Sequence, residues 1–312
     1  MKLDNQISGQ PAQLFLPSLN GQENKPSFPR LDKANFSVKL VPMYVAHPTM
    51  ANMGVNVPTN IAQAVVDDRT GAVISTAKGQ LRLVQNDQLH NAAKDAFKSL
   101  IPDTWPVILK EGVSNNGGFS ALTYKIPDYS ATIEQSNGST VSLTMQFTIV
   151  NAHARAVTAF ASFEDGSCGN TVIFTDAKAT SPHLDSFTTA PLEQHIKDAM
   201  HKAPEYVAML QKWARKDFEF FEFENLMRTQ GHLSPTQRGE LLTQFMEEEI
   251  PNRGSNLYAA LSSLAAWGTH NEGRFYVRNS RNTDNEAESL FARQEKIQRV
   301  VGSDAWKAVA NG

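Results

Sequence analysis

A strictly alternating stretch from Val141 to Ile149 constrains the fold more than any other feature of the 312-residue sequence. Every second residue in it is apolar, and the residues between are Ser, Thr or Gln. Because successive side chains of a strand point to opposite faces of a sheet, the pattern predicts a half-buried strand. Asn137-Gly138 and Asn151-Ala152-His153-Ala154 provide turn residues before and after it.

The neighbouring segments extend this strand into an antiparallel meander. Further strands are predicted at Ala72–Val84, Val107–Lys110, Phe119–Ile126, Ala156–Phe163 and Thr171–Thr175. Between Ala72–Val84 and Val107–Lys110 a helix is expected, with Asn86 as its N-cap and Leu89, Ala93, Ala96, Phe97 and Leu100 on one face.

From residue 186 the pattern changes to helices. One helix is expected from about Thr189 to Pro204, and a second from Pro204, because proline is favoured in the first turn. The second has an apolar stripe of Val207, Leu210, Ala214, Phe218 and Phe221, with Gly231 beyond its end. Capping boxes at Ser234–Gln237 and Thr283–Glu286 and the Ala-rich segment Asn256–His270 predict three more helices.

These patterns predict an α+β protein with a central antiparallel β-meander, preceded by a helix and followed by a multi-helix C-terminal half. Three regions are expected: an extended proline-rich N-terminal arm (1–60), an α+β core (61–185) and a helical region packed on it (186–312). The arm carries seven prolines and is not expected to form regular structure. Its apolar anchors, such as Val41–Val45, favour an arm laid across a neighbouring surface, either of the same subunit or of another, and we expect a homo-oligomer through this arm.

Composition excludes several classes of protein. The net charge of -3 and pI of about 6.2 give no global basic field, so any nucleic-acid site must be local. A single cysteine, Cys168, is typical of a reducing compartment. No apolar run approaches the roughly 20 residues needed to span a bilayer, and the first residues lack the apolar stretch of a signal peptide. We expect a cytoplasmic protein without membrane contacts.

No group of residues has the pattern of a conventional enzyme active site, and no cofactor is implied. Cys168 lies in a polar turn that explains its small size without a thiolate. His183 and Asp185 lack a further metal ligand nearby, and Glu247–Glu249 is most simply a solvated helix end, although nuclease carboxylates can look similar. No catalytic or metal-binding residue is therefore predicted. The aromatic run Phe218–Phe223 fits a helix packed on two sides or a ridge for a partner.

One segment combines cations with aromatic rings: Arg274, Phe275, Tyr276, Arg278 and Arg281. Arginine neutralises phosphates and aromatic rings stack on unpaired bases, so these residues are the candidate site for single-stranded DNA. The alternative is a basic connector between helices. Lys125 and Arg155, on the meander, are further candidates.

Several segments resemble a family of phage and plasmid proteins, domain of unknown function nine-three-two. The resemblance covers about Gly71 to the C-terminus and is carried by Gly79–Asn86, Asn151–Arg155, Cys168–Thr171, Asn256–Leu261 with Thr269-His270, and Asp304–Lys307. It implies a bacteriophage or other mobile-element origin and hence the host cytoplasm. The order of elements is also similar to single-strand annealing proteins of the Rad fifty-two type. This implies an oligomeric recombination protein that binds and anneals single-stranded DNA without a cofactor; the alternative is a structural or host-inhibitory protein that acts through protein–protein contacts.

Overall fold

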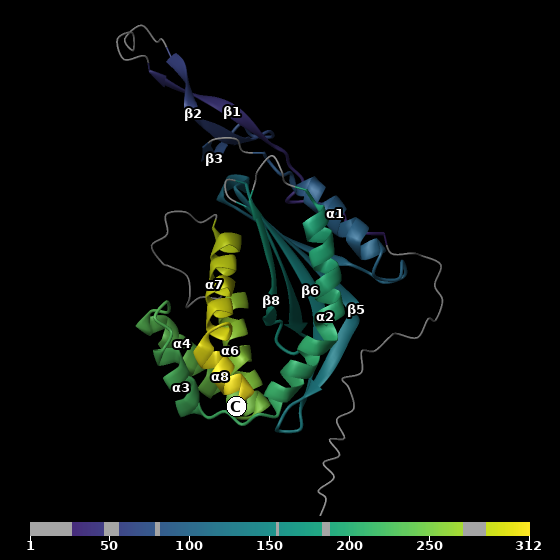
Figure 1. Ribbon diagram of the computed structural model, residues 1–312, viewed down its shortest axis with the longest axis vertical. Coiled ribbons are helices and arrows are strands. Elements are labelled where there is room, and N and C mark those ends of the chain that lie inside the picture. The colour runs from purple at the N-terminus through teal and green to yellow at the C-terminus, as the bar shows by residue number, and fades with distance from the viewer. Residues whose placement is uncertain (1–26, 47–55, 79–81, 154–155, 183–187, 271–284) are drawn as a thin grey trace, which may run out of the picture.

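The computed structural model describes residues 27–46, 56–78, 82–153, 156–182, 188–270 and 285–312 (Figure 1). It contains a three-stranded antiparallel sheet of β1 (Val38–Ala46), β2 (Asn56–Asp67) and β3 (Val73–Lys78), and a five-stranded one in the sequential order β4-β5-β6-β7-β8. Helices follow in the C-terminal half. The predicted α+β class, with a central antiparallel meander preceded by a helix, is confirmed.

The second sheet is formed by β4 (Ile108–Ser114), β5 (Phe119–Glu134), β6 (Thr140–Ala152), β7 (Ala156–Asp165) and β8 (Thr171–Pro182). The helices are α1 (Asn86–Lys98), α2 (Ala190–Ala214), α3 (Phe220–Arg228), α4 (Pro235–Gln244), the π-helical turn η3 (Phe245–Glu249), α5 (Ile250–Arg253), α6 (Leu257–Thr269), α7 (Glu286–Val301) and α8 (Asp304–Asn311). A short 3-10 turn, η2 (Asn115–Gly117), joins β4 to β5.

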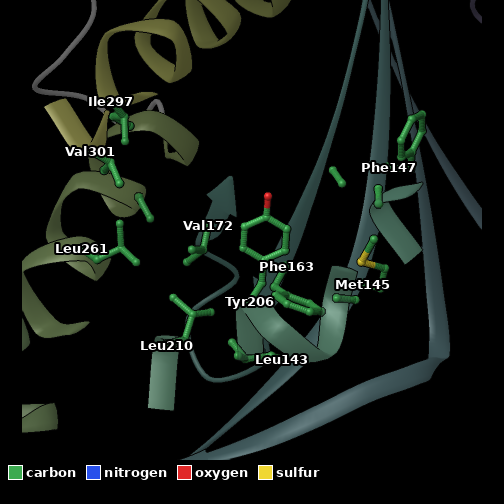
Figure 2. Close-up of a cluster of buried hydrophobic side chains, with 14 of the residues drawn as sticks. Leu143, Met145, Phe147, Phe163, Val172, Tyr206, Leu210, Leu261, Ile297 and Val301 are labelled. Atoms are coloured by element: carbon green, nitrogen blue, oxygen red, sulfur yellow. The ribbon is translucent and has the colours of Figure 1, made fainter. Parts of the chain in front are cut away.

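The alternating stretch forms β6, and its apolar residues line the main core. Phe147 of β6 lies opposite Tyr124 on β5 and Ala161 on β7, and all three are buried. Figure 2 shows side chains from β6, β7, β8, α2, α6 and α7 meeting in one apolar cluster. The strand predicted at Val141–Ile149 is confirmed, but it is half-buried only at its start, since Gln146 and Thr148 on the other face are buried as well.

The start of α1 differs from the prediction by one residue. Gln85 is the N-cap, and β3 ends at Lys78 rather than continuing to Val84. Asn86 is instead buried: its side chain donates to Ala34 O at 3.1 Å and accepts from Asn151 Nδ2 at 2.9 Å. An asparagine typical of caps therefore serves here to join the N-terminal segment, α1 and β6.

The prediction that regular structure is absent before residue 60 is wrong. Residues 38–46 form β1, which pairs with β2, and the boundary expected between residues 60 and 61 falls inside β2. Pro42 is tolerated because β1 is an edge strand and because the register shifts between Pro42 and Tyr44. Proline content alone was a misleading guide in this segment.

The prediction of a helix break at Pro204 is also wrong, since α2 is 25 residues long and continues through Pro204. Proline has no N–H to donate to the carbonyl four residues earlier, which here belongs to Met200. The hydroxyl of Tyr129, on β5, donates to Met200 O at 3.0 Å instead. A side chain from the sheet thus replaces the missing hydrogen bond of the helix.

The apolar stripe predicted from Val207 to Phe221 is interrupted. Helix α2 ends at Ala214. After it, Asp217 forms an isolated antiparallel bridge with Asn256, and Phe218 N donates to Ser255 O at 3.2 Å. Phe218 is fully buried, whereas Phe221 in α3 is 72% exposed. The run Phe218–Phe223 is therefore neither one helix nor uniformly buried.

Helix α6 occupies the centre of the helical layer and is buried along residues 257–268. Gly268 allows α7 to approach closely, because a Cβ there would lie 2.3 Å from Ile297 Cδ1. The N-terminal half of α7 covers part of the opposite face of the sheet, where Phe291 stacks on Phe160 and contacts Phe119. The capping box at Ser234 is confirmed, and the one predicted at Thr283 lies partly outside the described residues.

Candidate functional site

Most of the predicted nucleic-acid residues lie outside the described part of the chain. Residues 271–284 contain Arg274, Phe275, Tyr276, Arg278 and Arg281, and residues 154–155 contain Arg155. The residues that flank 271–284 on either side form hydrogen bonds with the ends of strands β8 and β4. Thr269 Oγ1 accepts from Thr171 N at 2.8 Å, and Ala287 N donates to Ser114 Oγ at 2.9 Å.

Lys125 is described, and its charge is already balanced. Its Nζ lies 2.6 Å from Glu164 Oε1, and the side chains are 30% and 24% exposed. Gln146, between them on β6, donates to the other oxygen of the same carboxylate. A phosphate bound at Lys125 would have to compete with Glu164. Lys125 is the only one of the seven candidate residues that lies in the described part of the chain.

The clearest unusual surface is a β-ribbon formed by β1 and β2, which we call the arm. It projects beyond the five-stranded sheet at one end of the molecule (Figure 1). Among the described residues, β3 pairs with β2 over Ala62–Val66, and the pairs from Tyr44–Pro58 to Ala46–Asn56 involve β1 and β2 alone. An isolated two-stranded ribbon has only marginal stability in water.

The arm has no charged side chain along most of its length. From Leu40 to Val66, 27 residues contain no Asp, Glu, Lys or Arg, the longest such run in a chain of which 20% is charged. Tyr44 on β1 is 60% exposed. Pro42 and Pro58 remove backbone donors from the strands, as in protected sheet edges. The faces of the ribbon, rather than its edges, are therefore the surfaces suited to contact.

The base of the arm is firmly held. Gln85 mimics a neighbouring strand: its side chain accepts from Val38 N and donates to Val38 O, both at 2.9 Å. Phe36, Val38 and Val65 pack with Ala77 in a small core. The hydrogen bond from Arg69 lowers the pKa of Asp67, so this pair stays charged at the corner of the arm. The arm thus has a defined direction relative to the sheet.

A polar cleft of about 430 Å³ lies where the β7–β8 turn meets η3, α5 and the end of α6. Buried Arg253 lies 2.8 Å from Asp165 and 2.7 Å from Glu249, and its side chain is 6% exposed. Although burial opposes its charge, the carboxylates raise the pKa of Arg253 above its usual value. Tyr258 also donates to Asp165, at 3.2 Å. The prediction that Glu247–Glu249 is entirely solvated is therefore wrong for Glu249, which is 5% exposed.

Cys168 lies on the rim of this cleft. Arg253 Nη2 is 3.2 Å from its sulfur, and His270 Nε2 lies 3.1 Å from its carbonyl oxygen and 2.8 Å from Asn170 Oδ1. The surroundings of Cys168 raise the pKa of its thiol through partial desolvation and the Asp165 and Glu249 charges, although the side chain itself is exposed to solvent and Arg253 acts in the opposite direction. The thiol is thus kept protonated, unlike a nucleophile activated for catalysis.

A second cleft, of about 630 Å³, lies between α7, β3 and the β4–β5 turn. Its floor is apolar, with Phe119 and Phe291, and Glu288 and Glu295 lie among its polar lining residues. Asn115 and Asn116 in the turn have positive φ angles of 56° and 53°. The acidic lining does not favour phosphate groups.

The arm and the Arg253 cluster were missed as candidate sites by sequence reasoning. The arm has a signal that could have revealed it, the 27-residue run without charge. The Arg253 cluster has none, because Asp165 and Arg253 are 88 positions apart and neither belongs to a motif.

Among the described residues, no three His, Cys, Asp or Glu side chains are grouped to hold a metal ion. Over the same ranges, none of the helices combines the length and apolar character required to cross a bilayer.

Comparison with known proteins adds no relative. No protein-family model matches the chain, and neither a curated protein nor a solved structure is significantly similar to it. The resemblance to phage and plasmid proteins and to annealing proteins stays a prediction, and the site must be interpreted from its own geometry.

Proposed function

We propose that the chain is a structural protein that assembles into homo-oligomers through its arm. The observation that carries this proposal is the charge-free ribbon beyond β3, in which, among the described residues, only β1 and β2 pair with each other and Tyr44 is exposed. A partner that covers the face bearing Tyr44 would bury this side chain. This develops the alternative, stated above, of a protein that acts through protein–protein contacts.

The expected energy of the contact is substantial. A tyrosine buries roughly 150–250 Å² when fully covered, so covering the 60% of Tyr44 that is exposed contributes about 2–4 kcal/mol at ~25 cal/mol per Å². The uncharged residues on either side add apolar area without desolvating a charge. Because the base is held by Val38, Val65 and Gln85, little orientational freedom is lost on docking.

Shortening the arm tests the proposal. In the structure Pro42 lies opposite Gln63, so replacing residues 43–62 by Asn-Gly closes a two-residue hairpin on the retained base. We expect the wild type to have a light-scattering mass above the 34.4 kDa of one chain and the shortened variant to have the mass of a monomer. Deleting residues 1–26 is the matched control, since it leaves the arm intact. A monomeric wild type at tens of micromolar would refute the proposal.

Single-stranded DNA binding by this assembly is the second candidate function. The observation that favours it is the anchoring of both ends of the 271–284 segment, through Thr171 at the start of β8 and Ser114 at the end of β4. Across the paired strands, Thr171 lies level with Thr144 of β6, and Ser114 lies level with Ala152 of the same strand. The two anchors are therefore about eight residues, or roughly 26 Å, apart along the direction of the strands.

The arginines and the aromatic residues can be tested separately. Replacing Arg274, Arg278 and Arg281 by alanine should weaken binding to labelled single-stranded DNA of every sequence. Each lost phosphate contact should reduce the salt slope by roughly 0.7. Tyr276→Ala should weaken binding by about 1–3 kcal/mol with the slope nearly unchanged. Lys125→Ala is the control, because Glu164 already neutralises this lysine. Wild-type affinity and slope in the triple variant would show that the segment is a connector.

A further inference from the structure

An apolar cleft of about 220 Å³ lies at the point where the described part of the chain begins. Ser27 and Phe28, the first two residues described, are among those that line it. The cleft is also lined by Phe97 near the end of α1 and by Ile101 and Trp105 in the loop that follows this helix. The residues that precede Ser27 are therefore attached directly to the rim of the cleft.

The aromatic side chains of the cleft are supported by the core. The ring centroid of Phe28 lies 6.3 Å from that of Phe97 and 5.9 Å from that of Tyr124, and Trp105 lies 6.3 Å from Tyr129. Pockets for small molecules usually have volumes of roughly 300–1,000 Å³. A smaller apolar cleft suits one or two side chains of a peptide segment rather than a cofactor.

The first 26 residues contain a segment of suitable chemistry. Leu14-Phe15-Leu16 and Leu19 bring four large apolar side chains together. Residues 20–26, between this group and the cleft, are all polar residues, glycine or proline, and can span at most about 25 Å. A flexible linker this short gives an effective concentration of about millimolar, so even a weak apolar contact would be occupied.

We propose that residues 14–19 dock in this cleft of their own copy, with Phe15 and Leu16 as the side chains that enter it. The same segment from a second copy would lack the advantage of the short linker. The docked segment would cover Trp105 and would hold the chain on both sides of Ser27 against the core. This inference is independent of the proposed self-assembly, because the arm begins only at Val38.

Trp105 makes the docking measurable by fluorescence. The chain has four tryptophans, and three of them are between 1% and 6% exposed: Trp213, Trp267 and Trp306. Trp105 is only partly buried. Quenching of the tryptophan fluorescence by acrylamide therefore reports mainly on Trp105, and a docked segment should protect it.

Removing two apolar side chains from the segment tests the docking. Phe15→Ser together with Leu16→Ser should weaken docking roughly tenfold or more, because two large side chains no longer gain from leaving water. Quenching should then increase to the level of a chain that lacks residues 1–26. Leu3→Ser together with Ile7→Ser is the matched control, since it removes two apolar side chains from the same terminus but outside the segment. Its quenching should equal that of the wild type.

Two further measurements identify the surface and the copy that are involved. In a Trp105→Phe background, removal of residues 1–26 should no longer change the quenching. In the wild type the protection should persist on dilution, as expected for docking within one copy. Protection that is lost on dilution would show that a neighbouring copy supplies the segment, and would overturn the proposal. Unchanged quenching in the Phe15→Ser, Leu16→Ser variant, or an equal increase in the control, would also overturn it, whereas the mass of the wild-type assembly would be unaffected.

Discussion

The hydroxyl of Tyr129 should stabilise the fold through the helix carbonyl that Pro204 leaves without its usual donor. Tyr129→Phe removes only the hydroxyl, which donates to Met200 O at 3.0 Å. Leaving a partly buried carbonyl unpaired destabilises a protein by roughly 1–3 kcal/mol. We therefore expect the free energy of unfolding to fall by about 1–2 kcal/mol.

The effect should depend on the proline. In a Pro204→Ala background, the new N–H can donate to Met200 O within α2, and Tyr129→Phe should then be nearly neutral. Proline inside a helix is roughly 3 kcal/mol less favourable than alanine, so Pro204→Ala alone should stabilise the chain. The gain should be smaller than 3 kcal/mol, because Tyr129 already supplies the missing bond and because proline restricts the unfolded chain.

A double-mutant cycle by chemical denaturation measures this dependence. The coupling energy between Tyr129→Phe and Pro204→Ala should be about 1 kcal/mol, above the ~0.5 kcal/mol scatter of independent sites. All four proteins should keep the same assembly state, which light scattering can verify. An equal loss from Tyr129→Phe in both backgrounds would show that the hydroxyl does not replace the proline's missing N–H.

Three further predictions follow from the buried polar groups. Arg253→Met leaves two buried carboxylates without their cation and should destabilise the fold by about 3–5 kcal/mol in chemical denaturation, whereas Arg215→Met, in an exposed pair, should change it by less than ~1 kcal/mol. Burial lowers the pKa of His90 below its usual 6.5, so the unfolded chain binds the proton more tightly than the folded one. The free energy of unfolding should therefore be highest above pH 6.5 and should decrease as the pH falls below it. The decrease should be smaller in His90→Gln. Comparable loss in both proteins would contradict this assignment. Cys168→Ser should retain the thermal melt, the assembly state and any DNA affinity, because a serine oxygen can accept from Arg253 as the sulfur does; loss of assembly or binding with an unchanged melt would reveal a function of the thiol.

The meander could be predicted because its signals are local. Alternation over Val141–Ile149 and the turn at Asn115–Gly118 depend only on neighbouring residues, and both appear in the structure as expected. In a sheet whose strands pair in sequential order, each strand finds its partner across a short turn. Local patterns are then enough to indicate the topology as well as the strands.

The errors arose where a distant contact overrides a local preference. Pro204 is tolerated in α2 because Tyr129 lies 75 positions away in the sequence and only the folded chain brings them together. Glu249 is buried because its partner Arg253 is held by Asp165, at the end of β7. The β1 strand forms because β2 pairs with it, although its own Pro42 argues against a strand.

Candidate sites were harder to predict than the fold. The residues chosen for chemical type, Arg274 to Arg281 and Arg155, lie outside the described residues, and Lys125 is paired with a glutamate that sequence reasoning did not connect to it. The arm could have been found from its missing charges. A search for unusual absences in a sequence is therefore a useful complement to a search for motifs.

The burial of α6 has a consequence for how the chain folds during synthesis. All five strands of the large sheet have emerged by residue 182, and each can pair with the strand before it. Helix α6, which is buried along residues 257–268, emerges about 75 to 90 residues later, and until it is in place the core that it completes stays open to water. At a ribosome rate of about 5–20 residues per second, this interval lasts several seconds, during which exposed apolar surface favours aggregation. Chaperone dependence during synthesis should therefore be concentrated between the completion of β8 and the arrival of α6.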